Sequence, residues 1–476
     1  INLGIAVVVL RMTRPDGATV VKADPEPATE SSQGGALTPS ARLTILLGFG
    51  LAGFASLLTQ VAWIRALILV IGGSVYAFTI TLASFLAGIG LGSLLYARFL
   101  STSSNDYRLG QAAMLAILIS LTLLLGLPVI GMLPRWFMLG FEAAIAIDFA
   151  VFQIFVFSLC FMVMILPTLF MGALFPLVAV IWTRSSQAAG QGVGGAYAIN
   201  TIGTIFGALL GGLFILPWLG AHTTVMLTAA IYMVVAGLFW LSAGLAGLRR
   251  NAVAGIASVF IVGLVAWLIP PWDRLLMASG VYYRAQVTNE LMKEHSLDEI
   301  VADAELLYYE EGLDGTVTVK RQNGDRFLAV NGKTDASSRG DLPTQILLGQ
   351  LPLQLDRDIR NAMVIGLGSG ITAGTVLTNE AVESLTVLEI SAEVVEASAF
   401  FDEENYSVLD NIRTRLVTAD ARNFLLATEE EFDLIVSEPS NPWISGISNL
   451  FTSEFFALAN SKLSPDGIMT QWFHAY

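Results

Sequence analysis

Apolar residues form long uninterrupted runs in the first half of the chain and short blocks between polar segments in the second half. A helix of roughly 20 apolar residues is long enough to cross a bilayer. Such runs predict about seven spans, near residues 43–64, 73–97, 110–133, 148–168, 198–219, 223–246 and 252–270. Residues 1–10 resemble the tail of an earlier span, and a mobile polar linker follows. Because the chain begins with Ile rather than Met, we expect a missing N-terminal part.

The segment 148–182 contains Pro167 and Pro176 and is too long for a simple crossing. As one helix it measures about 52 Å, against about 30 Å of hydrocarbon. We therefore expect it to be kinked, strongly tilted, or split into two pieces. A second feature of this half is the stripe Gly203, Gly207 and Gly211, which shares one helix face and predicts close helix packing. A transport path is the alternative interpretation.

The second half predicts a small strand-rich unit followed by alternating strands and helices. Strands at 316–320 and 326–330 flank Asn323-Gly324, a hairpin signal. The following strands are expected at 362–366, 385–390, 415–418, 432–437 and 467–472, with helices at 371–379, 392–401, 421–428 and 453–463. This alternation predicts a parallel sheet with helices on both faces and a ligand site at the carboxyl ends of its strands. Since the chain stops after the fifth strand, we also expect C-terminal truncation.

Composition separates the two halves further. Hydrophobic residues make up 54% of the chain and charged residues 13%, which is too apolar for an ordinary soluble protein. Residues 1–272 hold 11 basic and 7 acidic residues, and residues 273–476 hold 14 and 32, so the net charges are +4 and −18. The acidic second half argues against nucleic-acid binding. Cys160 is the single cysteine, which excludes a disulfide within the chain.

A glycine-rich loop follows the first predicted parallel strand. Gly366, Gly368 and Gly370 let the backbone approach a ligand, and the next helix offers free N–H groups. Glu389 lies about twenty residues further on, near the end of the second strand, where an acid can accept hydrogen bonds from a ribose. The spacing predicts a nucleoside-cofactor site, although Glu389 has the alternative interpretation of a solvated surface acid.

Two further clusters follow strand ends. Asp420, with Arg422, comes after the third strand, and the segment 437–443, Ser-Glu-Pro-Ser-Asn-Pro-Trp, comes after the fourth. Asp420 has an alternative role as the N-cap of the helix at 421–428, and this role is compatible with contact to an adenine. The proline-rich segment has the alternative interpretation of a plain turn.

The motifs of this half resemble the spermidine synthase family over about residues 305–476. They are Gln350–Leu353, Ala419–Leu425, Asp433–Pro442, Asn449–Phe456 and Leu463–Gly467. Together with the small-residue apolar half, the whole chain is similar to a membrane-fused spermidine synthase-like protein. The resemblance implies a multi-pass α-helical membrane bundle, then a small β subdomain and an α/β Rossmann-like class I methyltransferase domain. The expected parts are 1–42 (tail and linker), 43–272 (bundle), 273–360 (connector and β subdomain) and 361–476 (nucleoside-binding domain).

The resemblance also implies roles for individual residues. Glu389 would hold the ribose and Glu438 would act as general base. The loop Gly366, Gly368, Ser369 and Gly370 would contact the nucleoside, and Asp420 with Ala421 would face the adenine. Gln345 and Asn441 would line the amine site. The amine half departs from the family: Ser369 and Asn441 replace aspartates, and Thr344-Gln345 replaces a Tyr-His pair.

The implied function is aminopropyl transfer from decarboxylated S-adenosylmethionine, or a transfer from S-adenosylmethionine, to a small amine. No metal is expected. The expected partners are the lipid bilayer, an amine substrate, and a further copy of the chain or a membrane-complex subunit. The alternatives are a non-catalytic binding or assembly subunit, and a transporter-like bundle regulated by the nucleoside domain.

The charge pattern bears on which side of a cell (inner) membrane the second half occupies. If 148–182 crosses once, two basic residues, Arg65 and Arg135, fall on the side of the second half. The other nine fall opposite: Arg11, Arg14, Lys22, Arg42, Arg98, Arg108, Arg184, Arg249 and Arg250. The positive-inside rule then places the second half outside. S-adenosyl cofactors are cytoplasmic, which slightly favours the inside and requires 148–182 to cross twice.

Overall fold

The computed structural model describes residues 38–100, 105–183, 189–242, 244–355 and 358–473. The predicted span tail at 1–10 and the linker up to residue 37 lie outside these described residues, as do Arg184 and the last three positions.

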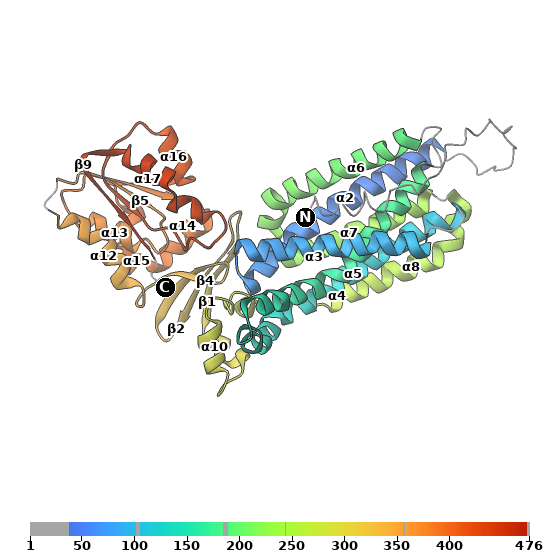
Figure 1. Ribbon diagram of the computed structural model, residues 1–476, viewed down its shortest axis with the longest axis horizontal. Coiled ribbons are helices and arrows are strands. Elements are labelled where there is room, and N and C mark those ends of the chain that lie inside the picture. The colour runs from blue at the N-terminus through green and yellow to red at the C-terminus, as the bar shows by residue number, and fades with distance from the viewer. Residues whose placement is uncertain (1–37, 101–104, 184–188, 243, 356–357, 474–476) are drawn as a thin grey trace, which may run out of the picture. The chain divides into compact units, whose positions relative to one another are not determined.

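Long apolar helices occupy residues 39–268 and run side by side (Figure 1). They are α2 (Pro39–Ile71), α3 (Val75–Leu95), α4 (Asn105–Ile145), α5 (Phe149–Thr183), α6 (Ala189–Leu210), α7 (Leu216–Ser242) and α8 (Gly244–Leu268), with π-helical turns at Tyr96–Leu100 and Gly211–Ile215. By length and composition, five described helical stretches are apolar enough to cross a membrane: Pro39–Ile71, Val75–Phe99, Arg108–Ile145, Phe149–Thr183 and Val193–Ser242. Val253–Leu268 is a shorter apolar helix.

The stretch Val193–Ser242 is interrupted at Gly220, whose φ of 73° and ψ of 167° are not helical. It therefore comprises two helices, one on each side of this kink. In contrast, α5 is a single helix that contains both Pro167 and Pro176, so the predicted alternative of two separate pieces is wrong. Pro176 has no N–H to donate to the carbonyl of Gly172. The hydroxyl of Ser93 on α3 donates to that carbonyl at 2.8 Å, which satisfies the freed acceptor.

Glycines bring helix backbones into direct contact, as predicted. A Cβ at Gly203 would collide with the carbonyl of Gly50, and one at Gly207 with the carbonyl of Phe54, so α6 lies directly against α2. Likewise, a Cβ at Gly92 on α3 would collide with the carbonyl of Leu169 on α5. Only glycine permits these approaches. The prediction of close packing is confirmed.

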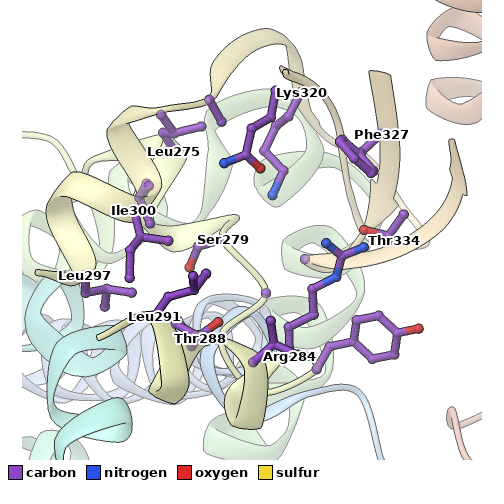
Figure 2. A pocket seen from close by; sticks show the side chains of 18 residues that line it. Leu275, Ser279, Arg284, Thr288, Leu291, Leu297, Ile300, Lys320, Phe327 and Thr334 are labelled. Carbon is purple, nitrogen blue, oxygen red and sulfur yellow. The ribbon is translucent and has the colours of Figure 1, made fainter. Parts of the chain in front are cut away.

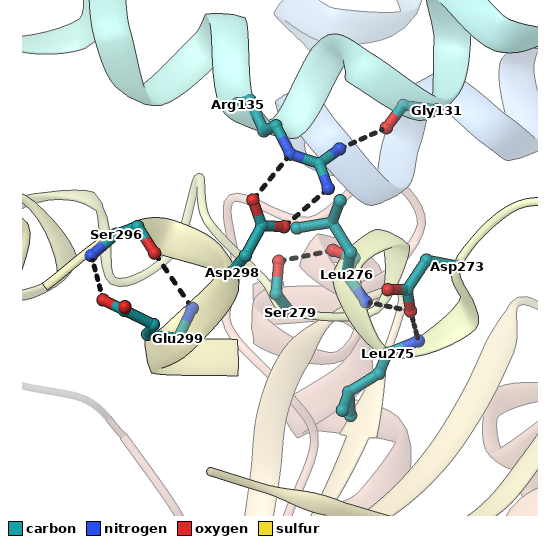
Figure 3. A network of polar contacts seen from close by, with 9 residues as sticks. All are labelled: Gly131, Arg135, Asp273, Leu275, Leu276, Ser279, Ser296, Asp298 and Glu299. Atoms are coloured by element: carbon teal, nitrogen blue, oxygen red, sulfur yellow. Dashed lines mark hydrogen bonds and ion pairs between the residues drawn. The ribbon is translucent and has the colours of Figure 1, made fainter. Parts of the chain in front are cut away.

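A connector of three short helices follows α8: α9 (Arg274–Met277), α10 (Ala285–Leu291) and α11 (Leu297–Ala302). Asp273 caps α9, and Ser296 with Glu299 forms a capping box at α11 (Figure 3). Arg135 of α4 donates two hydrogen bonds to Asp298, from Nε at 3.1 Å and from a terminal nitrogen at 2.5 Å (Figure 3). Both side chains are partly exposed. The ion pair therefore helps to orient α11 relative to α4 but contributes at most about 1 kcal/mol to the stability of the fold.

The small subdomain is a four-stranded antiparallel sheet in the order β1-β2-β3-β4. Its strands are β1 (Glu305–Glu311), β2 (Thr316–Gln322), β3 (Asp325–Val330) and β4 (Lys333–Ser337). The predicted hairpin is confirmed, because Gln322 pairs with Asp325 across the turn. Asn323 and Gly324 both have positive φ, at 52° and 77°, as a two-residue hairpin turn requires.

The last part is a five-stranded sheet in the order β7-β6-β5-β8-β9, with every pairing parallel. Its strands are β5 (Asn361–Ile365), β6 (Ser384–Glu389), β7 (Thr414–Thr418), β8 (Phe432–Ser437) and β9 (Leu463–Gln471). The main helices are α12 (Leu342–Leu353), α13 (Ile371–Leu377), α14 (Ala392–Ser398), α16 (Ala421–Ala427) and α17 (Ser453–Asn460). The predicted Rossmann-like parallel sheet is confirmed, although β9 begins four residues before the predicted start.

Alternation along the central strand builds a core on each face of this sheet. Ala362 and Val364 of β5 pack with α12 and α13, whereas Met363 and Ile365 pack with α16 and α17. Helix α14 packs against the small subdomain through Val394. The two sheets are thus held together, and residues of β4 are brought to the carboxyl edge of the parallel sheet.

Candidate functional site

The carboxyl ends of four parallel strands meet along one edge. Backbone hydrogen bonds continue past the strands: Gly366 N–H donates to Leu388 at 2.8 Å, and Ala419 N–H donates to Glu389 at 3.0 Å. On the other side of the central strand, Glu438 N–H donates to Ile365 at 2.9 Å. The segments after β5, β6, β7 and β8 therefore form one continuous rim, which is where ligands bind in such sheets.

The glycine loop connects β5 to α13. Gly366, Gly368 and Gly370 all have positive φ, at 89°, 53° and 81°. At Gly366 the need for glycine is also steric, because a Cβ there would lie 2.7 Å from the carbonyl oxygen of Glu438. The loop thus lies tightly against the segment after β8 and leads directly into α13.

Glu389 ends β6, beside the glycine loop, and its side chain is only 8% exposed. Its carboxylate accepts hydrogen bonds from the N–H groups of Leu367 (2.9 Å), Ile390 (2.9 Å) and Ser391 (3.0 Å). Burial raises the pKa of this carboxyl, and these N–H donors act in the opposite direction. The interpretation of Glu389 as a solvated acid is wrong. The carboxylate joins the loop to the end of β6, where the resemblance places the ribose.

Glu438 follows β8 and is half-buried on the rim. Burial raises its pKa to about 7, the hydrogen bond from Thr372 lowers it, and the nearby carboxylates of Asp341 and Asp335 raise it further. The hydroxyl oxygen of Thr372 also lies 3.0 Å from the backbone carbonyl oxygen of Gln345. Glu438 therefore lies in the same cluster as the predicted amine-site residues.

Ser369 and Gln345, two of those residues, are bonded to each other. The Ser369 hydroxyl donates to Oε1 of Gln345 at 2.5 Å, and Nε2 of Gln345 donates to the carbonyl of Ser337 at 3.2 Å. Both side chains are buried, at 1% and 4% exposure. The pair is neutral, and the two side chains satisfy each other.

A lysine in the small subdomain points to the same rim. The ammonium of Lys333 donates to the carboxylate of Asp335 at 2.5 Å and to the hydroxyl of Ser440 at 3.0 Å. Ser440 in turn donates to Asp335, and the ammonium lies 5.4 Å from the ring centre of Tyr283. Lys333 is 3% exposed. The chain thus supplies its own ammonium group within reach of the segment that carries Glu438.

The remaining predicted residues have clear structural positions. Asp420 is exposed and accepts a hydrogen bond from the Asn423 N–H at 2.8 Å, so its predicted role as the N-cap of α16 is confirmed. Ala421 packs into the core beside α17. Asn441 is buried at the turn after β8, where its carbonyl accepts from the N–H of Ile444. Contact of Asp420 and Ala421 with an adenine stays a prediction.

Sequence reasoning missed Lys333, Asp335 and Asp341, and it singled out Ser440 only as part of the segment 437–443. Lys333 and Asp335 are two apart on a strand, which places them on one face. That signal does not reveal which distant segment the face meets, because the pairing of β4 with the turn after β8 is a tertiary contact. Among the described residues, no group of three or more His, Cys, Asp or Glu side chains is arranged to hold a metal ion.

Comparison with known proteins gives this rim a family. Residues 343–472, which include the glycine loop, Glu389 and Glu438, match the spermine/spermidine synthase domain. The chain carries a spermine/spermidine synthase domain. The matched segment starts within α12 and ends just after β9, so it contains the whole parallel sheet.

Curated relatives extend the similarity beyond this domain. Polyamine aminopropyltransferase 1 of Streptomyces coelicolor is 23% identical over 450 residues, which cover 91% of this chain and 76% of the relative. The Oceanobacillus iheyensis polyamine aminopropyltransferase is 23% identical over 84% of this chain and 71% of its own length. That of Shigella dysenteriae serotype 1 is 31% identical over 144 residues, 30% of this chain and 50% of the relative. The first two alignments include the helical region.

The spermidine synthase crystal structure in complex with the transition state analogue AdoDATO aligns with a TM-score of 0.33 and 23% identity. It covers 35% of this chain and 57% of that chain.

Proposed function

We propose that the chain is a membrane-bound transferase that moves an aminopropyl group from a decarboxylated S-adenosylmethionine-type donor to an amine. The observation that carries the proposal is the rim itself, where a buried acid closes the glycine loop and a second acid, Glu438, lies beside it. The spermine/spermidine synthase domain match and the polyamine aminopropyltransferase relatives support the same reaction.

In this proposal different residues of the rim bind the donor and remove the proton. The loop from Gly366 to Gly370 holds the nucleoside, and Glu389 accepts hydrogen bonds from the ribose hydroxyls. The acceptor nitrogen attacks the aminopropyl carbon next to the sulfonium, the carbon–sulfur bond breaks, and methylthioadenosine leaves. Glu438 takes the proton that the attacking ammonium must lose. Its pKa of about 7 suits a general base at neutral pH.

Not every carboxylate near Glu438 is available to bind the ammonium group of the acceptor. Asp335 is already paired with Lys333, and Ser369 and Gln345 satisfy each other. Glu438 and Asp341 are therefore the carboxylates we assign to the incoming ammonium group. The acceptor is a small amine, and its identity has to come from assay of several candidates.

The test is methylthioadenosine production by the purified full chain from decarboxylated S-adenosylmethionine, with putrescine, cadaverine and spermidine as separate acceptors. Glu438→Gln should abolish turnover and leave methylthioadenosine affinity within about twofold. Glu429→Gln, an exposed acid in the loop before β8, is the matched control and should behave as wild type. No product with any acceptor, or equal rates for both variants, would refute the catalytic role.

The apolar helices support the membrane part of the proposal. Because S-adenosyl donors are made in the cytoplasm, the transferase requires its α/β domain there. The distribution of arginines at the helix ends favours a second candidate function. With α5 continuous, Arg42, Arg98 and Arg108 lie at the helix ends opposite Arg65 and Arg135, and the positive-inside rule places the α/β domain outside. There it would act as a non-catalytic binding or assembly subunit.

A further inference from the structure

A cavity of about 140 Å³ lies between the connector and the small sheet (Figure 2). Helices α9, α10 and α11 form one wall, and strands β2, β3 and β4 form the other. The connector side is largely apolar, with Leu275, Val287, Leu291, Leu297 and Ile300. Ser279, Thr288 and Thr334 add hydroxyl groups (Figure 2). The wall thus combines hydrocarbon with a few hydrogen-bonding groups, the usual mixture of a ligand site.

Two cations line this cavity, and no Asp or Glu does. Lys320 comes from β2 and donates to the carbonyl of Ala278 at 2.8 Å. Arg284 comes from the start of α10, and its guanidinium carbon lies 5.6 Å from the ring centre of Phe327. In the described part of the chain, neither side chain has a carboxylate within ion-pair distance. In a chain with 39 acidic residues against 25 basic ones, two uncompensated cations at one cavity stand out.

The two cations also affect each other. Burial, and then the positive charge of Arg284, lower the pKa of Lys320 to about 8. An anion between them would relieve both the repulsion and the cost of burying the ammonium. At neutral pH Lys320 is still mostly protonated and able to bind one.

We propose that this cavity binds a small organic carboxylate, with the carboxylate on Lys320 and Arg284 and a short hydrocarbon chain against Leu291 and Ile300. The volume sets the size of the chain. A cavity of about 150 Å³ holds a benzene molecule, so the occupant has roughly six carbon atoms. This site is separate from the nucleoside rim and does not depend on the proposed transferase activity.

The test is calorimetric titration of the purified full chain with pentanoate, pentanamide and inorganic phosphate. Pentanoate should bind saturably, and its neutral isostere pentanamide at least about tenfold more weakly, because it loses the charge-assisted hydrogen bonds. Phosphate, which has no hydrocarbon, should also bind at least about tenfold more weakly. Equal affinity for pentanoate and pentanamide would overturn the charge recognition, and phosphate binding as tightly as pentanoate would overturn the apolar part.

Variants locate the binding. Lys320→Met keeps the length and apolar stem of the side chain and should weaken pentanoate about tenfold or more. Lys293→Met, an exposed lysine of the same connector, is the matched control and should not change affinity. Ile300→Trp fills the cavity without removing a charge and should abolish binding if the folded state is retained in thermal unfolding. Unchanged affinity in Lys320→Met, or in folded Ile300→Trp, would place the binding elsewhere.

Discussion

The hydroxyl of Ser369 donates a hydrogen bond to the side-chain carbonyl of Gln345, and both groups are buried on the rim of the parallel sheet. The pair is neutral and already satisfied, so an incoming ammonium gains no charge from it. The carboxylates near Glu438 are instead Asp335 and Asp341, which come from the small subdomain and from the start of α12. In the proposed transferase, the amine would therefore meet carboxylates from these two segments rather than Ser369 and Gln345.

Glu389→Gln should weaken methylthioadenosine binding by roughly tenfold or more, because the amide presents N–H groups to the N–H donors of Leu367 and Ser391. Titration calorimetry with methylthioadenosine measures the effect. Glu383→Gln, at the exposed other end of β6, is the control and should bind normally. Wild-type affinity in Glu389→Gln would remove this acid from the nucleoside site.

Glu438 should make both stability and activity depend on pH between about 4.5 and 7. In this window the folded protein retains a proton that the unfolded chain releases, so stability falls as pH rises. The rate of aminopropyl transfer should rise over the same range, because the base must be deprotonated. Thermal unfolding and initial rates measured from pH 5 to 8 test both trends. A Glu438→Gln variant that keeps the wild-type slope of stability with pH would contradict the assignment.

Lys333→Met should lower the KM for putrescine several-fold, because it releases the carboxylate of Asp335 for the second ammonium group of a diamine. The double variant Lys333→Met with Asp335→Asn should lose that gain. Steady-state kinetics that separate KM from kcat measure the change. A KM that does not respond to either variant would show that Asp335 lies outside the acceptor site.

Gly366→Ala and Gly368→Ala form a matched pair in the loop. Both residues have positive φ, so each substitution strains the backbone by about 1 kcal/mol or more. Only the Cβ at Gly366 also meets the carbonyl of Glu438, whereas the one at Gly368 has its nearest neighbour at 3.9 Å. Gly366→Ala should therefore lose more thermal stability and more methylthioadenosine affinity than Gly368→Ala. The reverse order would contradict the loop geometry.

Cysteine labelling in intact cells separates the two candidate functions. Glu429→Cys places an exposed thiol on the α/β domain, and Ser40→Cys places one at the start of α2. The transferase proposal expects Glu429→Cys to be protected from an impermeant thiol reagent. The wild-type chain is the blank, since Cys160 is buried. Rapid labelling of Glu429→Cys with protection of Ser40→Cys would favour the binding or assembly subunit.

Local patterns predicted most of the fold. The hairpin at Asn323-Gly324, the strand before Gly366 and the acid at Glu389 depend on short-range spacing, and the structure has each of them. The continuity of α5 was not predictable, because the carbonyl freed by Pro176 is satisfied by Ser93 on another helix. Lys333 escaped prediction for the same reason, since its partner Ser440 is more than a hundred residues away in sequence.

The glycine contacts restrict how the helices are able to move. At Gly203 and Gly207 the backbones of α6 and α2 touch, and at Gly92 and Gly172 those of α3 and α5 do. At these glycines no side chains lie between the two backbones. Neither pair therefore has a side-chain layer that could repack while one helix slides past the other. We therefore expect α2 to move together with α6, and α3 together with α5, in any rearrangement of the helices.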